Sequence, residues 1–275
     1  MPAAREGPRH GAGDLGARIL FAIPAILFAI LIVAQGGLVF AAGLFLLGVI
    51  ALGELYTLMA RVRPINIAGF LTLGGMLAAA LYGEPRHVLM AMVIGFLVTF
   101  YFSFLRPRRE NVSWAIAATL FGAFWVGLAM VHAVFLRETP HGDGLVVDVL
   151  VGTFLGDTAA YFGGRLYGRR PLAPQISPNK TLEGLIAGII GGTFAFWCSG
   201  LYQDWLSGPD ALIIGAAVAL TAPLGDLFES LIKRDLEVKD TGKLFGPHGG
   251  VLDRLDAVFF SMVAAYYAAV ALGYG

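Results

Sequence analysis

The chain has 275 residues, of which 57% are hydrophobic and 14% are charged, and its formal net charge is zero. A water-soluble domain carries about a quarter charged residues, so this composition and the mean hydropathy of +0.76 exclude that class. Apolar runs of roughly 18–25 residues fit helices that cross a bilayer core, and the polar–apolar alternation of a barrel is absent. The single cysteine, Cys198, excludes a disulfide framework and a thiolate metal site.

In chain order, residues 1–17 are rich in Gly, Ala, Arg and Pro and predict a disordered tail. The apolar run at 19–34 has the basic flank of a signal peptide, but no small-x-small cleavage site follows, which favours an uncleaved first helix. The sequence therefore predicts an all-α, polytopic integral membrane bundle of about nine transmembrane helices. The further predicted spans are 38–60, 65–82, 87–105, 112–136, 145–164, 182–203, 210–232 and 251–273.

The basic residues predict the orientation of the bundle. Of the 19 Lys and Arg residues, all but Arg86 and Arg137 fall on one side of a nine-span topology. Cytoplasmic loops carry such an excess. We therefore expect a multi-pass protein of the cell membrane with its N-terminus and the 233–250 loop in the cytoplasm and its C-terminus outside.

Charge is concentrated between the last two predicted spans. Asp226, Glu229, Ser230 and Lys233 follow one another at helical spacing, so they should share one helix face. Asp253 and Asp256 repeat this spacing at the start of the last span. Simple salt bridges between helix ends are one interpretation, but so many ionisable groups at membrane depth favour a functional site.

Ligand type points to a hard cation at this site. Several carboxylates, no cysteine and a single nearby imidazole, His248, suit Mg²⁺ better than zinc. Basic residues surround the carboxylates and would neutralise phosphate charge. Together these features favour phosphoryl-type transfer. The basic residues are Lys233, Arg234, Lys239, Lys243 and Arg254.

A glycine pair precedes the last span. Gly249 and Gly250 allow positive φ and close approach of the backbone to a ligand, and a helix start directly after them directs N–H groups toward an anion. A flexible turn is the alternative interpretation. His248 could donate to phosphate or shuttle a proton, and the sequence does not decide between these roles.

Two further segments belong to the same side. Asp157 is an intramembrane acid near the end of the sixth predicted span, and a functional role is favoured for it. Ser177 or Asn179 could cap the seventh helix, where Lys180 would meet an anion. The remaining acids at membrane depth, Asp148 and Glu54, have no neighbours that suggest a task, and we expect helix packing or a lateral gate.

The segment 230–256 resembles the signature of the phosphatidate cytidylyltransferase (CDP-diacylglycerol synthase) family. The matching positions are Ser230 to Arg234, Lys239-Asp240, Gly242, Phe245-Gly246, His248 to Gly250 and Asp253 to Asp256. Gly156-Asp157 and Ser177 to Thr181 are also similar to the family, so the resemblance covers roughly 145–273. The N-terminal half resembles it only as a set of apolar helices. We expect a single membrane domain, with N-terminal helices over 18–136 and a catalytic region over 145–275.

The resemblance implies the reaction CTP + phosphatidate → CDP-diacylglycerol + pyrophosphate with Mg²⁺, and a family site that can hold a second cation. By resemblance, Asp226 and Asp253 match the metal-binding positions. The residues expected to be catalytic are Lys233, Arg234, Lys239, Asp240, His248 and Asp256. Those expected to bind substrate are Asp157, Ser177, Asn179, Lys180, Ser230, Gly249, Gly250 and Arg254.

The expected partners are CTP, phosphatidic acid and the lipid bilayer, with no nucleic acid, and the oligomeric state stays open, a homodimer included. The main alternative function is an ion-coupled transporter, although transporters place their charges near the midplane and have repeated halves. A CDP-alcohol phosphotransferase would need an Asp-Gly-x-x-Ala-Arg motif, which is absent. A non-catalytic lipid-binding protein would not need paired carboxylates. The residues that recognise cytidine remain unassigned.

Overall fold

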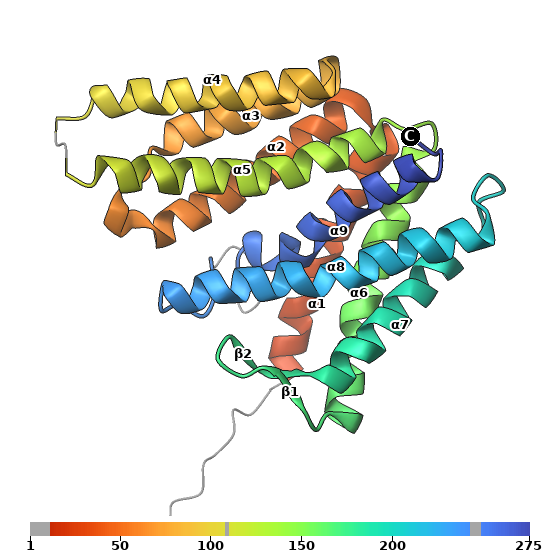
Figure 1. Cartoon of the computed structure of the whole chain (residues 1–275). Helices are drawn as coiled ribbons and strands as arrows, with labels where there is room; N and C mark the ends of the chain where they lie inside the picture. The colour runs from red at the N-terminus through yellow and green to blue at the C-terminus, as the bar shows by residue number, and fades with distance from the viewer. Residues whose placement is uncertain (1–11, 108–109, 243–248) are drawn as a thin grey trace, which may run out of the picture.

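The computed structural model describes residues 12–107, 110–242 and 249–275, with side chains from residue 23 onward. Within them the chain forms nine α-helices, which confirms the predicted polytopic helix bundle (Figure 1). Of the expected tail over 1–17, residues 1–11 lie outside the described residues, and residues 12–17 belong to α1. The helices are α1 Ala12–Gln35, α2 Gly37–Leu58, α3 Asn66–Tyr82, α4 Pro85–Phe104, α5 Val112–Arg137, α6 Gly142–Tyr167, α7 Leu182–Gly200, α8 Gly208–Asp235 and α9 Leu252–Ala271.

Seven of the helices in the described part of the chain, α2 and α4 to α9, are long and apolar enough to cross a bilayer. Helix α3 is apolar but shorter, with 17 residues. In α1 the apolar stretch with described side chains is Ile23–Gln35. Helix α6 extends beyond the predicted span 145–164 at both ends, and α1 begins before residue 19, the predicted start of its span.

Several segments that connect successive helices contact one another at one end of the bundle. Arg137 Nε donates to Val33 O at 2.7 Å, which joins the end of α5 to the end of α1. The ring of His141 stacks on Trp205, with ring centroids 4.3 Å apart, and Trp205 packs edge-on against Tyr274. The connections after α1, α5 and α7 therefore lie together with the C-terminal residues.

The other connections meet at the opposite end. Arg106 donates to Arg63 O at 2.7 Å and to Pro64 O at 2.9 Å, which joins the segment after α2 to the segment after α4. Arg234 Nε donates to Ile176 O at 3.0 Å, which joins the end of α8 to the connection between α6 and α7. This alternation of ends is what successive crossings of a membrane produce.

The connection between α6 and α7 contains a small hairpin that the sequence did not predict. Strands β1 Pro171–Ala173 and β2 Ser177–Thr181 pair antiparallel, with Pro171 opposite Thr181 and Ala173 opposite Ser177. A short 3₁₀ turn, Ala60–Val62, follows α2. The hairpin lies beside the ends of α6 and α7, below α8 in Figure 1.

Helices α6 and α7 approach each other along small residues. A Cβ atom at Gly192 of α7 would lie 2.9 Å from Gly152 O and 3.3 Å from Gly156 Cα of α6. Because these neighbours are backbone atoms, they have little freedom to move aside. Small residues at such positions let two membrane helices pack at close range.

Gly192→Ala tests this packing. The added methyl group meets backbone atoms, so we expect the free energy of unfolding to fall by about 1–3 kcal/mol. Gly53→Ala is the matched control, since a Cβ atom at Gly53 of α2 meets nothing within 4 Å. Thermal unfolding in detergent measures both variants, and equal melting temperatures would contradict the close contact.

Candidate active site

A polar cavity of about 740 Å³ lies where α6, β2, α7, α8 and α9 meet. Among the described residues, six carboxylates and four basic side chains line it, so this part of the lining carries an excess of negative charge when all of them are ionised. Much of the expected site converges here. The expected residues in the lining are Asp157, Ser177, Asn179, Lys180, Asp226, Lys233, Asp240, Asp253, Arg254 and Asp256.

Other expected residues are not part of the lining. Ser230 lies behind Asp226 and donates to its Oδ1 at 3.3 Å. Arg234 holds the hairpin through Ile176 O. Lys239 is exposed, Gly249 and Gly250 are buried just before α9, and His248 lies outside the described residues.

Lys233 joins the end of α8 to the start of α9. Its Nζ lies 2.5 Å from Glu229 Oε2 and 3.0 Å from Asp253 Oδ1. The Glu229 side chain is 1% exposed and that of Asp253 is 7% exposed, so a single lysine forms ion pairs with two nearly buried carboxylates. The predicted stacking of Asp226, Glu229, Ser230 and Lys233 along one face of α8 is confirmed by these contacts.

Asp253 also holds the segment before α9. Its Oδ2 accepts hydrogen bonds from Thr241 N at 2.9 Å, Thr241 Oγ1 at 2.8 Å and Gly250 N at 2.7 Å. A carboxylate that accepts several N–H and O–H donors stays ionised readily. Asp253 therefore fixes both ends of the 241–250 connection to α9.

The next two amide groups point to a residue from the N-terminal half. Val251 N donates to Glu54 Oε1 at 3.1 Å, and Leu252 N donates to Glu54 Oε2 at 3.0 Å. With Gly250 N bound to Asp253, three successive donors at the start of α9 are engaged within the protein. The sequence suggested that these N–H groups face an anionic ligand, and in the structure they face two protein carboxylates.

The hairpin between α6 and α7 places the ammonium group of Lys180 beside α8. Lys180 of β2 forms an ion pair with Asp226 Oδ2, and both side chains are partly exposed to the cavity. The expected cap of α7 is corrected: Thr181 Oγ1 accepts from Gly184 N at 3.1 Å, because the strand continues to Thr181 before the helix begins. Ser177 and Asn179 lie instead within β2 and in the cavity lining.

Two more carboxylates complete the wall. Asp157 of α6 faces the cavity, close enough to Asp226 and Asp256 for their charges to repel, with Lys180 as the nearby cation. Asp256 is 9% exposed and accepts from Ala257 N at 2.7 Å. Like charges this close in a partly buried site favour the binding of a cation.

The donor set fits Mg²⁺. All the candidate ligands are carboxylates, and Glu229 Oε1 is buried without a hydrogen-bond partner among the described residues. In that same part of the chain, no group of three or more His, Cys, Asp or Glu side chains is arranged to hold a metal ion by itself. Mg²⁺ commonly takes one or two protein carboxylates and completes its shell with water and substrate phosphates, so an open, acid-rich wall is appropriate for it.

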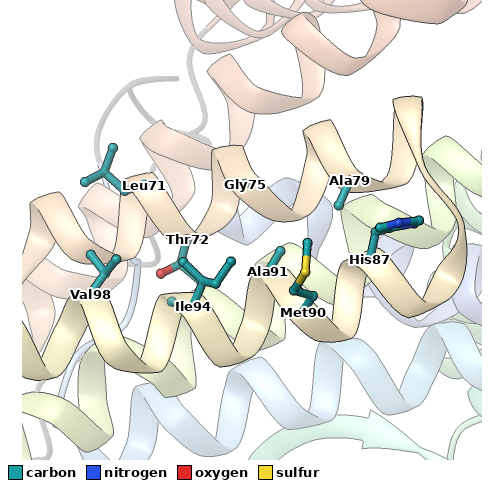
Figure 2. A pocket seen from close by; sticks show the side chains of 10 residues that line it. Leu71, Thr72, Gly75, Ala79, His87, Met90, Ala91, Ile94 and Val98 are labelled. Atoms are coloured by element: carbon teal, nitrogen blue, oxygen red, sulfur yellow. The ribbon is translucent and has the colours of Figure 1, made fainter.

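A second cavity, of about 200 Å³, lies between α3 and α4 (Figure 2). Its lining is mostly aliphatic, with Thr72, Met90 and Ile94 along the facing helix surfaces. His87 is the one ionisable residue among the described residues of its lining, and Glu84 N donates to the Nδ1 atom of that ring at 2.8 Å. This cavity has no paired charges and lacks the features of a phosphate or metal site.

Comparison with known proteins identifies the family to which the chain belongs. The sequence model of the cytidylyltransferase family matches residues 16–272. The chain belongs to this family. The match includes the N-terminal helices, which extends the resemblance beyond the expected 145–273.

Several curated relatives in the family are named phosphatidate cytidylyltransferase. The protein from Mycobacterium leprae is 38% identical over 160 residues, which cover 58% of this chain and 51% of that protein. The protein from Staphylococcus epidermidis is 31% identical over 252 residues, covering 88% of this chain and 94% of that protein. The chain thus spans about half the length of the mycobacterial relative and nearly all of the staphylococcal one.

The residues in or near the cavity that were not expected site residues include Arg165, Glu229, Thr241 and Glu54. Glu229 was placed on the right helix face but given no role, Thr241 carries no charge, and Glu54 lies far away in the sequence. A usable signal existed for Glu54, because it is the only acid between Asp14 and Glu84. An isolated carboxylate in a long apolar stretch normally has a partner.

Lys233→Met tests the shared ion pair. The substitution leaves the nearly buried Glu229 carboxylate without its cation, so we expect the free energy of unfolding to fall by about 3–5 kcal/mol. Adding Glu229→Gln should recover part of that loss. The control is Arg86→Met, which removes an exposed pair with Glu84 and should cost less than about 1 kcal/mol. Unfolding in detergent with equal losses for both single variants would contradict the buried pair.

Proposed function

We propose that the chain transfers a cytidylyl group from CTP to phosphatidate, giving CDP-diacylglycerol and pyrophosphate. The observation that carries the proposal is the cavity in which carboxylates and basic residues from α6, β2, α8 and α9 converge. Membership of the cytidylyltransferase family supports it, as do the names of the relatives from Mycobacterium leprae and Staphylococcus epidermidis.

The chemistry depends on control of negative charge. The nucleophile is a phosphate oxygen of phosphatidate, which is already anionic at neutral pH and needs no strong base. As it forms a bond to the α-phosphorus of CTP, the bond from that phosphorus to the pyrophosphate oxygen breaks. The protein must therefore hold two polyanions in line and stabilise the departing charge.

The side chains of the cavity match this task only with added cations. In the part of the lining that the structure describes, four basic residues face six carboxylates, so those basic residues alone leave a negative site. We propose Asp226 and Asp253 as ligands of Mg²⁺, with a second cation in the same acid-rich wall. Bound Mg²⁺ supplies Lewis-acid stabilisation of phosphate charge.

The basic residues are proposed to bind the phosphates directly. Lys180 and Lys233 are held by carboxylates in this structure, which keeps their ammonium groups at the cavity wall. Arg254 lines the same cavity. The other expected residues stay in the proposal as binding or catalytic groups: Arg234, Lys239, Asp240, His248, Asp256, Asp157, Ser177, Asn179, Ser230, Gly249 and Gly250.

Apolar residues in the lining suit the lipid substrate. Leu172, Leu185 and Pro223 share the cavity wall with the charged groups. We propose that phosphatidate enters sideways from the bilayer among the last four helices, with its headgroup at the carboxylates. The region 145–275 would then be the catalytic part of one membrane domain.

One assay tests the reaction. Purified protein with phosphatidate, Mg²⁺ and labelled CTP should form CDP-lipid and pyrophosphate, and Asp226→Asn and Asp253→Asn should each lower kcat at least 100-fold, since each removes a proposed metal ligand. Asp148→Asn is the matched control. That buried acid accepts from Ser199 and Gln203 between α6 and the residues around the end of α7, away from the cavity. Wild-type protein without product, or full activity in Asp253→Asn, would contradict the mechanism; ion flux in vesicles instead would favour the transporter alternative.

We further propose that the cavity faces the cytoplasm, where CTP is found, because the basic residues concentrate at that end. A reporter active only in the cytoplasm and fused after Gly275 should then be inactive, whereas the same reporter inserted after Leu236, in the α8–α9 connection, should be active. The reverse pattern would invert the proposed orientation.

A further inference from the structure

Glu54 connects the N-terminal helices to the candidate active site. It lies in the last part of α2, and its two carboxylate oxygens each accept one backbone N–H from the start of α9, Val251 and Leu252. Val251 is 1% exposed and Leu252 is 0% exposed, so water has little access to these donors. Buried N–H groups need a partner, and Glu54 supplies both acceptors.

Two glycines leave room for this carboxylate. A Cβ atom at Gly242 or at Gly250 would overlap the carboxyl group of Glu54, and in both cases the three nearest atoms belong to Glu54. Neither glycine has a positive φ. Their lack of a side chain is therefore explained by the space that Glu54 occupies, and we refer to Gly242 and Gly250 as the Glu54 cradle.

Asp253 depends on the same short segment. Its Oδ2 accepts from Gly250 N, the donor immediately before the two that Glu54 binds. Gly249 has φ of 81°, and a Cβ atom there would meet the Asp253 carboxylate. Displacing Glu54 would therefore release the first turn of α9 and, with it, the backbone that orients Asp253.

We propose that Glu54 is a positioning residue of the transferase: from α2 it anchors the start of α9 and so sets the place of Asp253 in the cavity. Glu54 is not in the cavity lining, and it acts through Asp253 without touching substrate. The proposal rests on the proposed function. It also gives the N-terminal half of the chain a defined part in the site.

The test is a double-mutant cycle of Glu54→Ala and Gly242→Ala, read as kcat, KM for phosphatidate and the Mg²⁺ concentration for half-maximal rate. Loss of a group that orients a metal ligand costs about 10–100-fold. We expect Glu54→Ala to lower kcat by that factor and to raise the Mg²⁺ requirement, with KM for phosphatidate changed less than about twofold. The kcat of Glu54→Gln should lie between those of the wild type and Glu54→Ala. The single amide oxygen of Gln can replace only one of the two carboxylate oxygens that accept from Val251 N and Leu252 N.

Gly242→Ala should reduce kcat in the wild type, since its methyl group takes the space of the Glu54 carboxyl group. In the Glu54→Ala background it should change kcat less than about twofold, because the space is then empty. Melting temperatures should follow the same non-additive pattern. If Glu54→Ala does not yield folded protein, the kcat and the Mg²⁺ requirement of Glu54→Gln decide the proposal, with wild-type values overturning it, and Asp148→Asn controls for the loss of a buried acid.

Three results would overturn the inference: wild-type kcat in Glu54→Ala, an unchanged Mg²⁺ requirement beside a lowered kcat, or fully multiplicative losses in the cycle. A wild-type protein that makes no CDP-lipid would instead remove the proposed function, and it is seen before any variant is measured. In that case the melting temperatures alone decide whether Glu54 occupies the cradle.

Discussion

The cavity depends on the two ion pairs that Lys233 forms with Glu229 and Asp253. Glu229 and Asp253 come from different helices, both are nearly buried, and Lys233 is the cation that lies between them. An ammonium group shared in this way holds the end of α8 against the start of α9 without cancelling all of the negative charge. The remaining charge is the basis of the proposed cation site, because Asp157, Asp226 and Asp256 stand in the same wall.

The apolar bundle makes this arrangement stable in a place where charge is unfavourable. Small residues bring α6 against α7 at close range, which places Asp157 and the hairpin at the same end as the acids of α8. The hairpin then contributes Lys180 to Asp226, while Arg234 of α8 holds the hairpin through Ile176 O. Packing in the membrane and ion pairing at its edge therefore support each other, and neither explains the cavity alone.

Local patterns predicted the parts of the protein that depend on local physics. Apolar run length located the nine helices found in the described residues, and helical spacing placed Asp226, Glu229 and Lys233 on one face, as the contacts confirm. The sequence did not predict the hairpin, because its strands are short and polar and are defined by pairing across a turn. Thr181 replaced Ser177 and Asn179 as the cap for the same reason. Glu54 gave no local hint of its partners, since they lie some 200 residues further along the chain.

The engagement of the α9 amide groups limits which groups could bind phosphate in the proposed reaction. Backbone donors at a helix start are fixed in space and would hold an anion in one place, but here Gly250, Val251 and Leu252 donate to protein carboxylates. In the proposed reaction, phosphate recognition then falls to flexible lysine and arginine side chains and to bound cations. Lys180 and Lys233 are paired with acids before substrate arrives, so a cation that binds those acids would release the ammonium groups toward phosphate. Cation and nucleotide binding would thus reinforce each other through the same carboxylates, which would account for the excess of acids over basic residues in the described lining of the proposed site.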